Sequence, residues 1–161
     1  MTSLRTATTE EFARWRAQTI PPYAADKVRT GRWSERESLA EAEKELASLL
    51  PAGQLTPGHL FFTMEAGSNP SVGFIWVAKA ERAFGPIGFI YDLVVWPEYR
   101  RQGFAAQAMR ALEVEAGKLG FRGLALHVFG HNGPARDLYV KLGYEPTNIQ
   151  MFKALGSPSG A

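Results

Sequence analysis

The stretch that decides the fold runs from residue 93 to residue 144 and contains two short patterns. The first, RRQGFA at residues 100–105, follows an apolar run and opens an amphipathic segment. The second, NGPARDLY at residues 132–139, follows another apolar run at residues 123–129. This order predicts a strand, a helix, a second strand and a second helix.

The glycine of the first pattern predicts an anion site. A helix N-terminus leaves backbone N–H groups unpaired and carries about half a positive charge, and a glycine at position 103 lets a phosphate approach those groups. Arg100 and Arg101 add two cations at the mouth of the turn. Asn132 and Tyr139 lie seven residues apart, which is two helical turns, so both fall on one face of the second helix. The sequence therefore predicts a pyrophosphate cradle followed by a polar clamp.

The two patterns, Arg-x-x-Gly-x-Ala at residues 100–105 and Asn-x-x-Ala-x-x-Leu-Tyr-x-x-x-Gly-Tyr at residues 132–144, occur in this order with a helix and a strand between them. In this the chain resembles the GNAT superfamily of acyl-CoA-dependent N-acyltransferases, over about residues 72–155. The first pattern alone would turn up by chance in about one of six such chains, so the pair carries the resemblance. The front half resembles a sparsely characterised bacterial branch of that superfamily.

The resemblance implies a fold and a reaction. The fold is α+β (mixed α/β), a GNAT-like central sheet that is mostly antiparallel, with a splayed parallel pair of strands and helices on both faces. The reaction moves an acetyl group from acetyl-CoA to a primary amine by direct attack within a ternary complex, without a metal. The acceptor is a small-molecule amine or a protein amine, and the protein is a monomer or a homodimer.

The resemblance also implies which residues bind acetyl-CoA. Backbone groups of Leu93, Val94 and Val95 should meet the pantetheine arm, and a bulge there should turn an N–H of Val94 or Val95 towards the thioester carbonyl. The RRQGFA turn should hold the diphosphate, and the Asn132 side chain should bond the cofactor arm. The implied residues are Leu93, Val94, Val95, Arg100, Arg101, Gln102, Gly103, Phe104, Ala105, Ala106, Asn132 and Tyr139.

Two catalytic roles follow from the resemblance and from proton chemistry. The Tyr139 hydroxyl should face the thioester sulfur and stabilise it as it leaves. The acceptor ammonium must lose a proton, and Asp92 is our candidate base because it is the only carboxylate on its strand. His127, Glu65 and Tyr91 acting through water are alternatives. Strand alternation puts Tyr91 and Asp92 on opposite faces unless a bulge shifts the phase.

Composition limits the class of protein. The chain has 161 residues, 45% of them hydrophobic, which predicts a single domain at residues 1–155 and a flexible tail at residues 156–161. A net charge of +2 does not predict nucleic-acid binding, and no apolar run is long enough to predict a membrane span or a secretory signal, so we expect a cytoplasmic protein. Without cysteine, acyl transfer through a thiol is excluded.

Turn residues and periodicity predict the remaining elements. A capping box at Thr8 opens a helix that Pro21 should end, with a second helical piece at residues 23–30, and a second capping box at Ser34 opens a helix to Leu50. The predicted strands are residues 4–7, 60–66, 72–80, 87–96, 123–129 and 144–153, and the later helices are residues 103–118 and 134–142.

Two other functions remain open. The chain could be a catalytically silent acyl-CoA-binding sensor, or the glycine-containing turn could bind another phosphate ligand such as a nucleotide, although neither common nucleotide-binding glycine motif is present. For an acceptor pocket, Trp15, Tyr23 and Trp33 supply aromatic side chains, which are equally consistent with a plain core.

Overall fold

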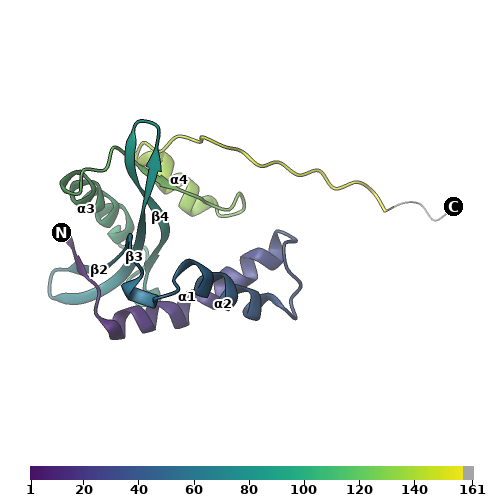
Figure 1. Cartoon of the computed structure of the whole chain (residues 1–161), viewed down its shortest axis with the longest axis horizontal. Helices are drawn as coiled ribbons and strands as arrows, with labels where there is room; N and C mark the ends of the chain where they lie inside the picture. Colours follow the sequence, from purple (N-terminus) through teal and green to yellow (C-terminus); the bar gives the residue numbers. More distant parts are fainter. Residues whose placement is uncertain (158–161) are drawn as a thin grey trace. The chain divides into compact units, whose positions relative to one another are not determined.

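The computed structural model describes residues 1–157, and the chain forms two compact units, Met1–Phe129 and a second beginning at Gly130. The first unit contains a five-stranded mixed sheet in the order β1-β2-β3-β4-β5 (Figure 1). Its strands are β1 (Thr2–Thr6), β2 (His59–Ala66), β3 (Asn69–Arg82), β4 (Gly85–Val95) and β5 (Leu124–Leu126). The first four strands pair antiparallel and β5 pairs parallel to β4, so the predicted fold class is confirmed.

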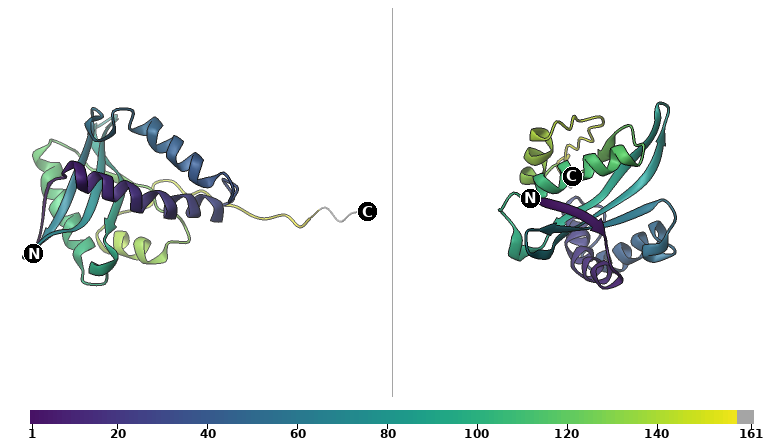
Figure 2. Two further views of the ribbon diagram at one scale, coloured as in Figure 1. Left: turned by 90° about the horizontal axis from the view of Figure 1, so that it is seen from below. Right: turned by 90° about the vertical axis from the view of Figure 1, so that its left-hand side faces the viewer.

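Helices cover both faces of this sheet. Two of them, α1 (Thr9–Arg29) and α2 (Ser38–Leu49), lie on one face, and α3 (Phe104–Lys118) lies on the other, as the right-hand view of Figure 2 shows. Short 3₁₀ turns at Gly53–Leu55 and Pro97–Tyr99 complete the unit. On the face of α1 and α2, the core is an aromatic cluster of Trp15, Phe61, Phe74, Trp76 and Trp96, with Ala7 and Leu50.

The long first helix corrects one prediction. Instead of ending at Pro21, α1 continues through both prolines to Arg29. A proline inside a helix leaves the carbonyl four residues earlier without its N–H donor. Here those carbonyls belong to Ala17 and Gln18, which are exposed to water, while Ile20 and Ala24 pack with Ala42 of α2. Solvation and packing together offset the cost of the prolines.

The start of α2 corrects a second prediction. The helix begins at Ser38 rather than Ser34. The Ser34 hydroxyl donates to the Glu37 carboxylate at 2.9 Å, so it is not used as a cap on the backbone, and the segment before Ser38 is a turn. The apolar face is placed as predicted at Ala42 and Leu50, whereas Leu39 is exposed.

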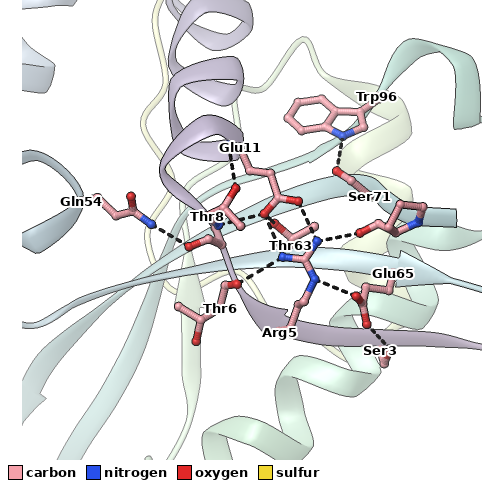
Figure 3. Close-up of polar contacts among 12 residues, drawn as sticks. Ser3, Arg5, Thr6, Thr8, Glu11, Gln54, Thr63, Glu65, Ser71 and Trp96 are labelled. Atoms are coloured by element: carbon pink, nitrogen blue, oxygen red, sulfur yellow. Dashed lines mark hydrogen bonds and ion pairs between the residues drawn. The ribbon is translucent and has the colours of Figure 1, made fainter.

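A polar cluster joins β1, β2 and α1 (Figure 3). The Arg5 guanidinium donates to both carboxylate oxygens of Glu11, at 2.7 and 2.9 Å, and to Glu65 at 2.6 Å. It also donates to the Pro70 carbonyl at 2.9 Å. Glu11 accepts in addition from Thr63 and from the Thr8 backbone N–H, which completes the predicted capping box of α1. These bonds hold the pKa of Glu11 down to about 2.

The second unit contains α4 (Gly133–Lys141), which ends before Gly143 in the left-handed conformation. The predicted strand at residues 144–153 is absent: described residues 145–157 belong to no helix or strand. A single extended segment is not a stable strand unless a neighbour pairs its backbone. The single domain at residues 1–155 stays a prediction. Of the predicted flexible tail, residues 158–161 lie outside the described residues.

Among residues 1–157, no helix is both long enough and apolar enough to cross a membrane.

Candidate functional site

The strand β4 is paired on both sides along only part of its length. It pairs with β3 from Gly85 to Val95, but with β5 only at residues 88–90. From Tyr91 to Val95, the edge of β4 on the β5 side has no strand partner among the described residues. Backbone N–H and C=O groups on such an edge are available to pair with an extended ligand. This matches the splayed parallel pair that the resemblance to the GNAT superfamily implied.

A β-bulge marks the place where the splay begins. Trp76 of β3 pairs with Asp92, but its neighbour Val77 pairs with Ile90, so Tyr91 is the extra residue. The predicted bulge at residues 93–95 is therefore misplaced, because Leu93, Val94 and Val95 pair regularly with β3. The bulge shifts the phase of the strand, and Tyr91 and Asp92 both contact the α1 side of the sheet. Tyr91 stacks on Trp76 at 4.4 Å between ring centroids, while Asp92 bonds Trp15.

Asp92 is held by α1. Its Oδ2 accepts from the Trp15 indole N–H at 2.7 Å and from the Thr19 hydroxyl at 3.3 Å. Trp15 and Thr19 are one turn apart on α1, which explains why both reach one oxygen. Burial raises the pKa of Asp92, and the bonds from Trp15, Thr19 and the Leu93 backbone oppose that rise. A carboxylate with a raised pKa can accept a proton, and this one also fastens α1 to β4.

The turn at residues 100–103 has an unusual backbone. Arg101, at φ 62°, is the one non-glycine residue of the described chain with positive φ, and Gly103 follows at φ 80°. The Arg100 side chain donates through Nε to the Val95 carbonyl at 3.1 Å, which ties the turn to the end of β4. The Arg101 side chain is exposed and makes no ion pair or hydrogen bond with any of residues 1–157. Two left-handed residues so close together form a concave set of amides that suits an anion.

The N-terminus of α3 adds to this concave turn. Gly103 is the N-cap residue, so no side chain caps the first turn of the helix, which contains Phe104, Ala105 and Ala106. A Cβ built on Gly103 would meet only the Gln107 amide, at 3.9 Å, which leaves the approach to these amides open. Gln102 is exposed beside them. The unpaired N–H groups of a fifteen-residue helix and the Arg101 charge thus lie on one short stretch of chain.

The other two predicted site residues belong to the second unit. The exposed Asn132 is the N-cap of α4, and its side-chain oxygen accepts from the Ala135 N–H at 3.3 Å. The Tyr139 ring packs at 5.8 Å from the Tyr144 ring, and the Tyr139 carbonyl accepts from the Tyr144 N–H at 2.9 Å. Asn132 at the N-cap and Tyr139 inside the helix thus belong to one element, α4, and their proposed roles stay predictions.

The rival bases occupy different surroundings. Glu65 is bound to Arg5 and accepts from Ser3, so it belongs to the polar cluster of Figure 3. His127 follows the last residue of β5 and is exposed, with its ring at 5.4 Å from that of Phe129. Tyr91 is 40% exposed and lies beside Asp92 at the bulge.

The aromatic residues considered for an acceptor pocket separate into core and surface. Trp15 is fully buried in the main core. Tyr23 and Trp33 pack edge to face at 6.0 Å, and Lys27 lies over both rings at 5.3 Å. The Tyr23 hydroxyl bonds Glu45, and burial raises its pKa.

Sequence reasoning missed one residue that the structure brings to the bulge. His59 accepts through Nδ1 from the Trp76 indole N–H at 2.9 Å, and its ring lies 6.0 Å from Tyr91. Burial lowers the pKa of His59. His59 and Phe61 are two residues apart on β2, so their side chains point to the same face of the sheet. This spacing could have predicted that His59 lies on the face of Phe61 and Trp76. Within residues 1–157, no group of three or more His, Asp or Glu side chains could hold a metal ion.

Comparisons with known proteins agree on one family. The model of the acetyltransferase (GNAT) family matches residues 23–144. The N-acetyltransferase YycN of Bacillus subtilis, named as uncharacterized, is 35% identical over 147 residues, which cover 91% of this chain and 94% of YycN. The similarly named YdgE of the same organism is 32% identical over 153 residues, covering 95% and 98% of the two chains.

A solved structure supports the same assignment. The crystal structure of Bacillus subtilis YycN superposes with a TM-score of 0.90 at 35% identity, covering 96% of this chain and 99% of that one. The family match, the two relatives and the shared fold are consistent with the splayed strands and the glycine turn described above. The chain belongs to the GNAT family of acetyltransferases.

Proposed function

We propose that this protein transfers an acetyl group from acetyl-CoA to a primary amine by direct attack within a ternary complex. The observation that carries the proposal is the exposed, uncapped turn at residues 100–103, which opens α3 and is bonded through Arg100 to Val95 at the end of the free edge of β4. Family membership gives the reaction class. The acceptor is a small-molecule amine or an amine of a protein.

The residues of the turn fit the diphosphate of coenzyme A. The amides of Phe104, Ala105 and Ala106 have no side-chain cap and would each gain a partner from a phosphate oxygen. Arg101 offers a guanidinium that makes no ion pair with the described residues, so it can pair with phosphate charge. Arg100 is already bonded to the Val95 carbonyl, and we assign it to shaping the turn together with Gln102.

The free edge of β4 fits the amides of the pantetheine arm. Leu93, Val94 and Val95 pair with β3 on one side only, so alternate backbone groups on the other side can bond an extended ligand. On the second unit, the remaining side-chain donor of Asn132 is assigned to the same arm. Acetyl-CoA would supply the acetyl group as a thioester.

We assign Tyr139 to the departing sulfur. A phenol with pKa near 10 is a weaker acid than a thiol near 8.5, so full proton transfer to the thiolate is uphill by about 2 kcal/mol. A hydrogen bond to the sulfur is sufficient. Tyr139→Phe is expected to slow turnover by about ten- to a thousandfold with acetyl-CoA binding intact. Loss of turnover below detection with binding intact would contradict this role.

We assign Asp92 to the proton of the acceptor amine. Its raised pKa and its place at the bulge beside the exposed Tyr91 support this role. Asp92→Asn keeps an oxygen for the Trp15 indole but removes the proton acceptor, so it should abolish most turnover while thermal stability changes little. Thr19→Val is the matched control, because it removes one bond to Asp92 and leaves the carboxylate. Equal activity of Asp92→Asn and wild type would exclude Asp92 as the base.

One observation favours a second function, a catalytically silent acyl-CoA sensor. The Asp92 oxygen that is bonded to Trp15 at 2.7 Å already fastens α1 to the sheet, which is a structural use of the same carboxylate. A sensor would bind acetyl-CoA and release no thiol with any amine.

Two measurements test the proposal. Thermal unfolding with acetyl-CoA, ATP or NAD reports which ligand binds, since a ligand at one hundred times its dissociation constant adds about 2.7 kcal/mol to stability. We expect a shift with acetyl-CoA alone. Release of free thiol across polyamines, amino acids, antibiotic amines and peptide amines then reports turnover. A shift without turnover would identify the sensor, and a shift only with ATP or NAD would overturn the proposal.

A further inference from the structure

Four aromatic side chains form a partly exposed group on the α1 side of the sheet. The Tyr91 ring stacks on Trp76 at 4.4 Å between centroids, and the Phe89 ring meets Tyr91 edge to face at 4.9 Å. The His59 ring lies 5.7 Å from Trp76 and 6.0 Å from Tyr91. We call these four residues the aromatic shelf. Trp76 is buried, His59 and Phe89 are half-buried, and Tyr91 is 40% exposed, so the shelf keeps ring surface that a ligand can cover.

The shelf ends at the candidate base. Trp76 is the cross-strand partner of Asp92, and Tyr91 precedes Asp92 on β4. Because of the bulge, the side chains of Tyr91 and Asp92 both contact the α1 side of the sheet, where Trp15 of α1 bonds the Asp92 carboxylate. A molecule that lies on the Tyr91 ring therefore has a carboxylate beside one of its ends. One polar group next to an apolar surface is the usual composition of a small-molecule site.

The charge of the shelf favours one kind of amine. His59 accepts through Nδ1 from the Trp76 indole, and burial lowers its pKa, so the imidazole is neutral and does not repel an ammonium ion. A second ammonium, as in a polyamine, would have no carboxylate among the four shelf residues, and its contact with an exposed ring is weak. A flat ring instead extends the stack that Trp76 and Tyr91 begin.

We propose that the acceptor is a primary amine on a short carbon chain that ends in an aromatic ring, with the ring on Tyr91 and the amine at Asp92. This inference rests on the acetyl-transfer function proposed above and names its substrate class. Of the three ammonium protons, Asp92 takes one and passes it to water. The nitrogen lone pair then bonds the acetyl carbon as the carbon–sulfur bond breaks. The second proton goes to the departing sulfur, and the third stays on the amide.

Thiol release with matched amines tests the preference. Phenylethylamine carries the aromatic ring, cyclohexylethylamine has the same carbon count without a flat ring, and spermidine carries further cations. We expect kcat/KM to be about three- to tenfold higher for phenylethylamine than for the other two, mainly through KM, because ring stacking adds to apolar burial. Equal values for the three amines, or a higher value for either of the other two, would overturn the inference.

Variants of Tyr91 connect the preference to the shelf. Tyr91→Leu removes the ring and keeps an apolar side chain, so the preference for phenylethylamine should disappear. Tyr91→Phe keeps the ring and should keep the preference, which separates stacking from any role of the hydroxyl. Phe84→Leu makes the same kind of exchange at a phenylalanine that is 65% exposed outside the shelf, and it should also keep the preference. A preference that survives in Tyr91→Leu would contradict the proposed contact.

Binding measured without turnover separates this inference from the proposed reaction. Saturation-transfer NMR with phenylethylamine and coenzyme A reports contact of the ligand ring with the protein and needs no acetyl transfer. Contact in wild type that is lost in Tyr91→Leu, with no thiol released from any amine, would support the shelf and refute the transferase. Turnover without aromatic preference would refute the shelf and leave the transferase. Absence of ring contact in wild type would also refute the shelf.

Discussion

Two polar regions of the first unit differ in how far the hydrogen-bonding capacity of their arginines is used. Between β1, β2 and α1, Arg5 donates to Glu11, to Glu65 and to the Pro70 carbonyl, so each nitrogen of its guanidinium has an acceptor (Figure 3). At the end of β4, Arg101 is exposed and makes no ion pair with the described residues, and the helix behind it has no side-chain cap. A saturated cluster stabilises the fold, whereas an open turn keeps its binding capacity for a ligand.

The largest effect should come from breaking the saturated cluster. Arg5→Gln leaves two carboxylates facing each other without their cation, and we expect a loss of about 2 to 4 kcal/mol in the free energy of unfolding. Chemical denaturation measures it. Arg16→Gln is the matched control, because its pair with Glu43 is about half exposed and should cost under about 0.5 kcal/mol. If Arg5→Gln weakened acetyl-CoA binding and left stability intact, the division between the two regions would be wrong.

Acid should reveal the same cluster without a mutation. The pKa of Glu11 is about 2 when folded, below its ordinary 4.5, so its contribution to stability is present above about pH 5 and is lost as the pH falls towards 2. Because Arg5 is one-third exposed, we expect about 1 to 2 kcal/mol to be lost over this range. Denaturation midpoints from pH 6 to about pH 3 measure the slope. The slope should be shallower in Glu11→Gln, and an identical slope would contradict the assignment.

The open turn should show the reverse pattern. Arg101→Gln is expected to weaken acetyl-CoA binding about tenfold, which is the loss of one charge-assisted bond at an exposed site, and to change stability by less than about 0.5 kcal/mol. Isothermal titration at two salt concentrations measures both the affinity and its electrostatic part. Arg110→Gln changes an exposed arginine on α3, is the control and should bind normally. Equal weakening in both variants would indicate only a general charge effect.

The smallest effect should come from the backbone of that turn. Gly103→Ala places a Cβ at φ 80°, and because space is open there the cost is conformational, about 1 kcal/mol. Gly117→Ala, inside α3 with no atom within 4 Å of its Cβ, should stabilise by about 0.5 to 1 kcal/mol instead. Thermal unfolding of the two variants measures the opposite signs. If both variants changed the unfolding temperature in the same direction, position 103 would not require a glycine.

Much of this was predictable because local chemistry decided it. Gly103, Gly120 and Gly143 have positive φ at the helix ends where turn chemistry predicts glycine, and the strands of the meander lie close to their predicted bounds. The errors arose where tertiary contacts decided the outcome. α1 runs through Pro21 because packing outweighs propensity, and no local pattern showed that residues 144–153 would lack a neighbour.

At the candidate site, the sequence indicates which residue types are present better than it indicates to which side their side chains point. The glycine turn follows from the residue types at residues 100–105 and from the helix expected after them. The face of the sheet to which Asp92 points could not be predicted. Side chains alternate between the two faces along a regular strand, and one extra residue in a bulge reverses the faces of all residues after it. Tyr91 is that insertion, and nothing in the letters Ile-Tyr-Asp distinguishes a bulged strand from a regular one.

The bulge at Tyr91 also limits how the length of β4 can change. Ile87 and Ile90 are both buried and lie on opposite faces of the sheet, so deleting Gly88 or Phe89 between them would bring the two side chains onto the same face and remove one of them from its packing. Changes of chain length are therefore tolerated at the hairpin turn of Ala83 and Phe84, and not inside the strand. In engineered or natural variants, the number of residues between the buried positions of β4 must therefore stay the same.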